Sequence, residues 1–169
     1  MRFSKIKNND IANGIGITMS LWTQGCPHHC KGCFNEETWD FAGGKLFGEE
    51  DLQYILSNID NFGIERNFAV LGGEPLAPSN VEGVIEVCRA VRERFPSKRI
   101  YVWTGYRIED FNEIQLQILS YIDMLIDGPF DINKRNLSIM LRGSSNQRII
   151  DVGSTLQKKK LVLSSLNNE

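Results

Sequence analysis

The chain has 169 residues, of which 41% are hydrophobic and 24% are charged, and its formal net charge is −2. This composition predicts one domain over residues 1–169 that buries a core without disulfide bonds. The charge argues against a general nucleic-acid binder or a membrane-surface protein. The first residues, MRFSKIKNNDI, lack an apolar signal core, and no apolar run approaches the roughly 18–20 residues of a membrane span. We therefore expect a cytoplasmic protein.

The first half of the chain predicts two strands and one helix around a cysteine-rich loop. Residues 16–23 indicate a strand that runs into the sequence GCPHHCKGCFN at residues 25–35. A helix is expected over residues 49–62, because apolar side chains recur there at helical spacing. These side chains are Leu52, Ile55, Leu56, Ile59 and Phe62. The short apolar run at residues 68–71 predicts a buried strand.

The second half alternates helices and strands. A helix is expected to begin at a capping box formed by Ser79 and Glu82 and to end before Pro96. A strand at residues 100–103, a helix over 108–121 and a strand at 124–126 follow. Phe111, Ile118 and Leu119 are expected to face inward from the second of these helices. Residues 149–152 predict a last strand.

Strands separated by helices of this length imply parallel βαβ units. A complete eightfold barrel needs about 250 residues. We therefore expect an α/β fold, an open partial (β/α) barrel of about five to six mostly parallel strands. Small or polar residues follow four of the strands, at 25–26, 72–75, 104–106 and 127–130. Ligands bind at the carboxyl ends of parallel strands, so these turns should converge on one site.

Three of the four cysteines, Cys26, Cys30 and Cys33, have the spacing C-x3-C-x2-C. In a reducing compartment, such clustering indicates metal binding or catalysis. Zinc is one interpretation, with His28 or His29 as the fourth ligand, although zinc sites usually draw on two separate ligand pairs. A redox dithiol needs only two cysteines. A [4Fe–4S] cluster held by three thiolates is the third interpretation, and it leaves one iron open for a ligand.

The turn Gly72-Gly73-Glu74-Pro75 offers a cradle for such a ligand. Glycines let backbone groups approach a ligand closely, and the Glu74 carboxylate can accept a hydrogen bond from an ammonium group. The fourth cysteine, Cys88, shares an apolar helix face and is expected to pack in the core.

The cysteine spacing together with Gly-Gly-Glu-Pro resembles the radical S-adenosylmethionine (SAM) enzymes. Further segments, at residues 37–39, 102–106, 126–130 and 142–148, make the chain similar to the family that activates anaerobic ribonucleoside-triphosphate reductases. They occur in the family's order and span most of the chain. The resemblance implies a radical SAM domain that acts as an oxidoreductase on a protein substrate.

The resemblance also implies roles for individual residues. Cys26, Cys30 and Cys33 ligate the cluster, and its open iron binds the amino and carboxylate groups of SAM. Glu74 and its turn, with Gly72 and Gly73, hold the SAM amino group, and the backbone around Gly32, Cys33 and Phe34 contacts the adenine. Many radical SAM enzymes carry an aromatic residue where this chain has Gly32, so no side chain can stack on adenine from that position.

The implied reaction is reductive cleavage of SAM to methionine and a 5′-deoxyadenosyl radical. That radical takes a hydrogen atom from a glycine of the anaerobic reductase, and a flavodoxin- or ferredoxin-type protein donates the electron. No catalytic side chain is expected beyond the cluster and SAM, because the cofactors carry the chemistry. A pocket that admits a backbone loop suits a protein substrate, and docking of the partner is expected to complete it.

Other positions keep two interpretations. Thr104 and Asp127, at strand ends, either contact SAM or stabilise turns, and residues 142–148 either touch a ligand or the reductase, or form a well-bonded loop. His28 and His29 are expected to be loop residues rather than ligands. The alternatives for the whole chain are an activase of another glycyl radical enzyme, a small-molecule radical SAM enzyme, and a non-catalytic zinc-binding module.

Overall fold

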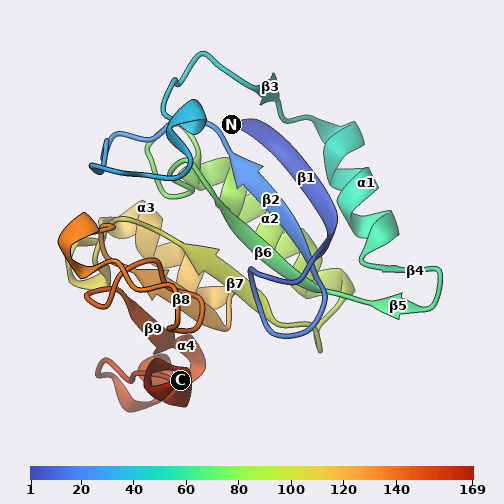
Figure 1. The fold of residues 1–169 in the computed structure, drawn as a ribbon. Helices are drawn as coiled ribbons and strands as arrows, with labels where there is room; N and C mark the ends of the chain where they lie inside the picture. Colours follow the sequence, from blue (N-terminus) through green and yellow to red (C-terminus); the bar gives the residue numbers. More distant parts are fainter.

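A mixed sheet of seven strands organises the chain, and the computed structural model describes residues 1–169 (Figure 1). The strands in chain order are β1 (Arg2–Asp10), β2 (Thr18–Thr23), β3 (Lys45–Leu46), β6 (Asn67–Gly72), β7 (Ile100–Trp103), β8 (Met124–Asp127) and β9 (Arg148–Asp151). Their order across the sheet is β3-β1-β2-β6-β7-β8-β9. A separate small hairpin pairs β4 (Asp60–Asn61) with β5 (Ile64–Glu65).

The four central strands, β2, β6, β7 and β8, run parallel to one another. Both edges of the sheet are antiparallel, because β1 pairs antiparallel with β2 and β3, and β9 pairs antiparallel with β8. The carboxyl ends of the four central strands therefore lie at one end of the sheet, where the loops that follow them meet.

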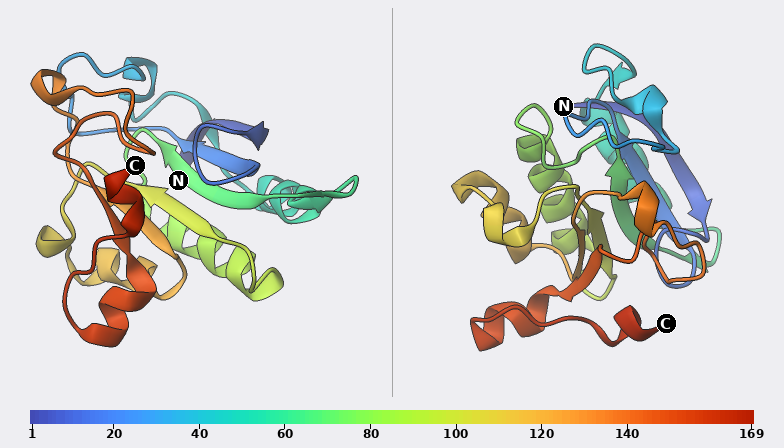
Figure 2. Two further views of the ribbon diagram at one scale, coloured as in Figure 1. Left: turned by 60° about the horizontal axis from the view of Figure 1, so that its bottom comes forward. Right: turned by 60° about the vertical axis from the view of Figure 1, so that its left-hand side comes forward.

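The helices α1, α2 and α3 pack on one face of this sheet (Figure 2). The α-helices are α1 (Glu49–Asn58), α2 (Val81–Arg94), α3 (Glu113–Leu116) and α4 (Val152–Lys158). Short 3-10 helices are η1 (Glu36–Thr38), η2 (Ile108–Asp110), η3 (Gln117–Ser120), η4 (Ile132–Lys134) and η5 (Ser165–Asn168). None of the helices combines the length and the apolar character that crossing a membrane requires.

Each central strand is buried on both faces, because successive side chains point to opposite sides of the sheet. In β6, for example, Phe68 and Val70 belong to the main core under the helices, whereas Ala69 and Leu71 belong to a second cluster on the opposite face. The second cluster comprises Trp22, Ala69, Leu71, Tyr101, Ile126 and Ile149. It forms the floor beneath the loops at the carboxyl ends of the strands.

The strands predicted at residues 68–71, 100–103 and 124–126 are confirmed as β6, β7 and β8. The helix predicted over 49–62 is shorter than expected, since α1 ends at Asn58 and the chain then enters the β4–β5 hairpin. Phe62 lies in this hairpin with a left-handed φ of 56° and an exposed fraction of 87%. The helical spacing of Phe62 with the preceding apolar residues is therefore incidental.

The capping box predicted at Ser79 and Glu82 is not formed. The helix α2 begins at Val81, and Asn80 occupies the N-cap position without a side-chain capping bond. The Asn80 amide instead donates to the carbonyl oxygens of Gln24 (2.9 Å) and Glu74 (3.0 Å), so its side chain connects the helix start to two site loops.

The helix predicted over 108–121 is broken into η2, α3 and η3. Asn112 has an extended backbone and begins α3, where its side chain accepts from the Gln115 amide in a capping box. That extended residue interrupts the helical path. The three side chains expected to face inward, Phe111, Ile118 and Leu119, are nevertheless buried.

The strands on either side of the parallel core, β1 and β9, do not follow the βαβ pattern. The last strand begins at Arg148 rather than at residue 149 and pairs antiparallel with β8, while Val152 already begins α4. Strand β1 was not predicted at all. Residues 11–17, between β1 and β2, are too short a segment for a parallel crossover, and residues 128–147, before β9, contain no α-helix that could cover the sheet. The sheet consequently has seven strands rather than five or six.

Candidate functional site

The four strand ends and their loops surround one pocket of about 440 Å³. Eight residues predicted for the site line it, namely Cys26, Cys30, Cys33, Phe34, Gly72, Gly73, Glu74 and Thr104. Gly32 and Asp127 do not line it, although Cys33 and Gly128 beside them do. The sequence reasoning missed Trp103 and the loop residues Ala12 and Asn13, which also contribute to the wall. Trp103 directly precedes Thr104 at a strand end, and this position could have indicated that it belongs to the site.

The cysteine loop is fastened at both of its ends. The amide of Gly25 donates to the Thr38 carbonyl (2.8 Å), and the amide of Cys26 donates to the Trp39 carbonyl (3.2 Å). Between these ends, the only backbone–backbone hydrogen bond of residues 27–34 runs from Cys33 to the Cys30 carbonyl (3.1 Å). The three thiols thus lie on a loop that side chains must hold in place.

All three thiols are free, and burial raises the pKa of Cys26 to about 11 and raises that of Cys30 as well. A coordinating metal reverses this preference, because a thiol that binds a metal gives up its proton. No group of three or more His, Cys, Asp and Glu side chains in residues 1–169 converges tightly enough to hold a single metal ion. Three thiols that line one pocket fit a multi-iron cluster, in which each iron takes its own thiolate.

The two histidines of the loop are engaged with other side chains. His28 Nε2 lies 2.7 Å from Glu74 Oε2, and the His29 ring meets the Trp39 ring edge-on at 4.6 Å. Neither imidazole is directed at the thiols as a fourth ligand. The prediction that they are loop residues agrees with this geometry, but His28 makes a specific contact that the sequence did not indicate.

The carboxylate of Glu74 is 1% exposed and accepts four hydrogen bonds. Oε1 accepts from the Leu76 amide (2.8 Å) and the Thr104 hydroxyl (2.7 Å). Oε2 accepts from the Gly105 amide (2.7 Å) and from His28. A carboxylate has about four lone-pair positions, so Glu74 has no free acceptor left. It connects its own turn, the end of β7 and the cysteine loop.

The turn requires both glycines, because the end of β2 and the backbone of Gly25 lie close against it. Gly72 has φ +112°, and a Cβ there would lie 2.8 Å from the Thr23 backbone. A Cβ on Gly73 would lie 2.6 Å from the Gly25 carbonyl oxygen. Because real Cβ atoms do not approach so closely, any larger residue would push the turn away from the cysteine loop.

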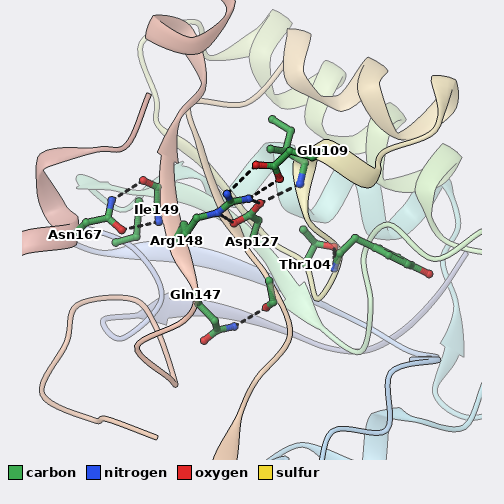
Figure 3. Close-up of polar contacts among 10 residues, drawn as sticks. Thr104, Glu109, Asp127, Gln147, Arg148, Ile149 and Asn167 are labelled. Carbon is green, nitrogen blue, oxygen red and sulfur yellow. Dashed lines mark hydrogen bonds and ion pairs between the residues drawn. The ribbon is translucent and has the colours of Figure 1, made fainter. Parts of the chain in front are cut away.

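Asp127 lies fully buried beside the pocket and is held by Arg148 (Figure 3). Its Oδ1 accepts from Arg148 Nε (2.8 Å), and its Oδ2 accepts from the Ile108 amide (3.0 Å) and from Arg148 Nη2. The same guanidinium donates two bonds to Glu109, at 2.8 and 2.7 Å, which lower the pKa of that carboxyl to about 2. Of the two roles predicted for Asp127, this geometry favours stabilisation of turns.

Residues 142–148 form a well-bonded wall of the pocket. Gln147 Oε1 accepts from the Gly143 amide (2.9 Å), while its Nε2 donates to the Gly128 carbonyl (3.0 Å). Arg142 lines the pocket and donates to the Asn167 carbonyl (3.0 Å). The segment therefore attaches the end of β8 to the C-terminal residues.

Comparison with known proteins agrees with this site. Residues 12–150 match the model of the family described as "4Fe-4S single cluster domain". The fold and the thiol-lined pocket thus define an iron–sulfur protein with one cluster.

Three relatives are named anaerobic ribonucleoside-triphosphate reductase-activating protein. The one from Haemophilus influenzae is 39% identical over 150 residues, which are 88% of this chain and 97% of the relative. The one from Escherichia coli K12 is 37% identical over 139 residues, 82% of this chain and 90% of the relative. The one from Enterobacteria phage T4 is 37% identical over 149 residues, which are 88% of this chain and 93% of the relative. The chain belongs to the family of anaerobic ribonucleoside-triphosphate reductase-activating proteins, which confirms the sequence-based family assignment.

Proposed function

We propose that this protein activates an anaerobic ribonucleoside-triphosphate reductase by generating a glycyl radical on it. One observation carries the proposal, namely that three free thiols and the Gly72-Gly73-Glu74 turn line the same pocket. The whole chain acts as one radical SAM domain, and its sheet is an open partial barrel. When bound, the reduced [4Fe–4S] cluster supplies the electron for cleavage of SAM to methionine and a 5′-deoxyadenosyl radical.

Cys26, Cys30 and Cys33 bind the cluster as three thiolates and leave one iron for SAM. Two observations support this ligand set. The thiols face one pocket, and neither His28 nor His29 is placed to complete a four-ligand zinc site. An iron with a free coordination position lets an iron–sulfur cluster bind and react with a substrate, rather than only carry electrons.

SAM binds against the turn that Glu74 holds. Because four donors already saturate the Glu74 carboxylate, the main chain of Gly72 and Gly73 receives the SAM amino group, while Glu74 fixes the shape of the turn. Thr104 supports the same carboxylate from the end of β7. The backbone of residues 32–34 contacts the adenine, in keeping with a Phe34 side chain that is 85% exposed.

The reductase docks over the mouth of the pocket. Phe34 and Leu137 line the pocket from loops far apart in the sequence, and their side chains are 85% and 74% exposed. Large exposed apolar side chains beside a pocket are typical of a protein interaction site. Docking there brings a glycine-bearing loop to the pocket and excludes water from the radical. A flavodoxin- or ferredoxin-type protein supplies the electron.

Anaerobic reconstitution tests the proposal. We expect a brown protein with about four iron and four sulfide per chain that cleaves SAM under dithionite. After incubation with the reductase, electron paramagnetic resonance (EPR) should show a glycyl doublet on the reductase. Cys30→Ala should abolish cluster loading and SAM cleavage.

Two results would contradict the proposal. Binding of one zinc ion without SAM cleavage would favour the zinc-binding module. SAM cleavage without a glycyl doublet on the reductase would favour an activase of another protein or an enzyme with a small substrate.

A further inference from the structure

The imidazole of His28 lies in a recess shaped by the end of β7. A Cβ on Gly105 would lie 2.6 Å from His28 Nε2, so the ring fits only because residue 105 has no side chain. Tyr106 meets the ring edge-on, with the centroids 4.6 Å apart. Glu74 lies at the inner end of the recess, 2.7 Å from Nε2. Three residues outside the cysteine loop thus accommodate one side chain of that loop.

His28 is the only one of the four donors to Glu74 that comes from the cysteine loop. The other three belong to the turn itself and to the end of β7, at Leu76, Thr104 and Gly105. A carboxylate accepts hydrogen bonds, and the imidazole tautomer with its proton on Nε2 is the one that donates to it in this contact. The side chain of His28 is 19% exposed and that of Glu74 is 1% exposed, so the bond is largely shielded from water.

The main chain of His28 faces a predicted cluster ligand. Its amide lowers the pKa of the Cys26 thiol, and the amide of Phe130, from a distant loop, lowers that of Cys30, although burial outweighs both effects and raises each pKa. The next residue, His29, has a left-handed φ of 46°, which is costly for a residue with a side chain. The contact of His28 with Glu74 helps to hold this loop, which has almost no backbone bonds of its own.

We propose that His28 is a positioning residue that joins the cysteine loop to the SAM-binding turn through Glu74. By holding its ring against Glu74, the loop keeps the His28 amide beside the Cys26 sulfur. Cluster environment and SAM affinity are then set together, because one carboxylate orients both parts of the site. This inference rests on the proposed function above.

The test compares His28→Leu, His28→Gln and His29→Leu after anaerobic reconstitution of the full chain. Glutamine keeps an N–H donor of similar reach, and the neighbouring histidine contacts Trp39 instead of Glu74. Three properties are measured: iron content, the dissociation constant of SAM by equilibrium dialysis, and the EPR spectrum of the dithionite-reduced cluster with and without SAM.

We expect His28→Leu to bind SAM at least about tenfold more weakly, as is typical when an orienting partner of a metal site is lost. The SAM-induced change in its EPR spectrum should be lost as well. His28→Gln should restore both properties, and His29→Leu should match the wild-type protein. Failure of His28→Leu to load iron would also support the proposal, provided that His28→Gln loads it.

Two outcomes would overturn the inference. The first is wild-type SAM affinity and EPR response in His28→Leu. The second is equal impairment of His28→Leu and His28→Gln, since the shape of the ring and not its hydrogen bond would then matter. In both cases the wild-type protein still binds iron and SAM. If the wild-type protein binds neither, the proposed function itself fails, so the two failures are distinguishable.

Discussion

Replacement of Arg148 by methionine tests the buried ion pair that joins β8 to β9. The substitution keeps an unbranched apolar side chain and removes the guanidinium. Asp127, which is fully buried, then keeps only the Ile108 amide as a partner. Removing one partner of a buried ion pair costs about 3–5 kcal/mol. Because the Arg148 side chain is 21% exposed and water can partly replace it, we expect the lower value, about 3 kcal/mol.

Urea denaturation of the reduced chain, followed by circular dichroism, measures this loss as a lower midpoint at an unchanged slope. In a thermal scan, a loss of about 3 kcal/mol corresponds to a fall of roughly 6–12 °C in Tm for a chain of this size. Glu109→Gln is the matched control, because it removes the exposed partner of the same guanidinium and should cost less than about 1 kcal/mol. A loss below about 1 kcal/mol in Arg148→Met, or an equal loss in Glu109→Gln, would refute the reasoning.

Three further predictions concern acid stability, thiol reactivity and docking. Arg148 holds the pKa of Glu109 at about 2 in the folded chain, below its ordinary value of 4.5. The Arg148–Glu109 ion pair therefore stabilises the fold above about pH 4.5, and this stabilisation is lost as the pH falls toward 2. Across this range the urea midpoint of Glu109→Gln should depend less on pH than that of the wild-type protein. Identical pH profiles of the two proteins would argue against this prediction. Burial raises the pKa of Cys88 to about 12, so iodoacetamide at pH 8 should leave it unmodified until the chain unfolds, as mass spectrometry can check. Leu137→Ala should raise the KM for the reductase without changing uncoupled SAM cleavage, whereas Phe62→Ala, also exposed, in the β4–β5 hairpin, should change neither. Equal effects of both would argue against docking at the pocket mouth.

The central sheet could be predicted because its strands are short apolar runs that end in small residues. The rule that ligands bind at the carboxyl ends of parallel strands then placed the cysteines and residues 72–75 at one pocket. Strand β1 could not be predicted in the same way. Its charged and polar residues do not form an apolar run, and its pairing with β2 gives it its extended form.

The side-chain partners in the site could not be predicted from the sequence, for a different reason. The contact of His28 with Glu74 joins residues 46 positions apart, and it depends on the missing side chain of Gly105. The role of Asp127 was undecided because only the antiparallel register places Arg148 opposite it. Local patterns carry no information on such long-range register, so the sequence identified the residues of the site but not their bonds.

The two margins of the sheet differ in how far they are covered. On one side, β3 pairs with Arg2 and Phe3 alone, so the rest of β1 has no strand beyond it. On the other, residues 162–167 cover β9, through hydrogen bonds from the Ser164 amide to the Ile149 carbonyl (2.8 Å) and from the Asp151 amide to the Val162 carbonyl (3.0 Å). Exposed strand edges recruit other chains by backbone pairing, and here only the β1 margin leaves an edge for that purpose. At the β9 margin a partner must instead be recognised by its side chains and loop shape, which makes recognition there selective for sequence rather than for any extended peptide.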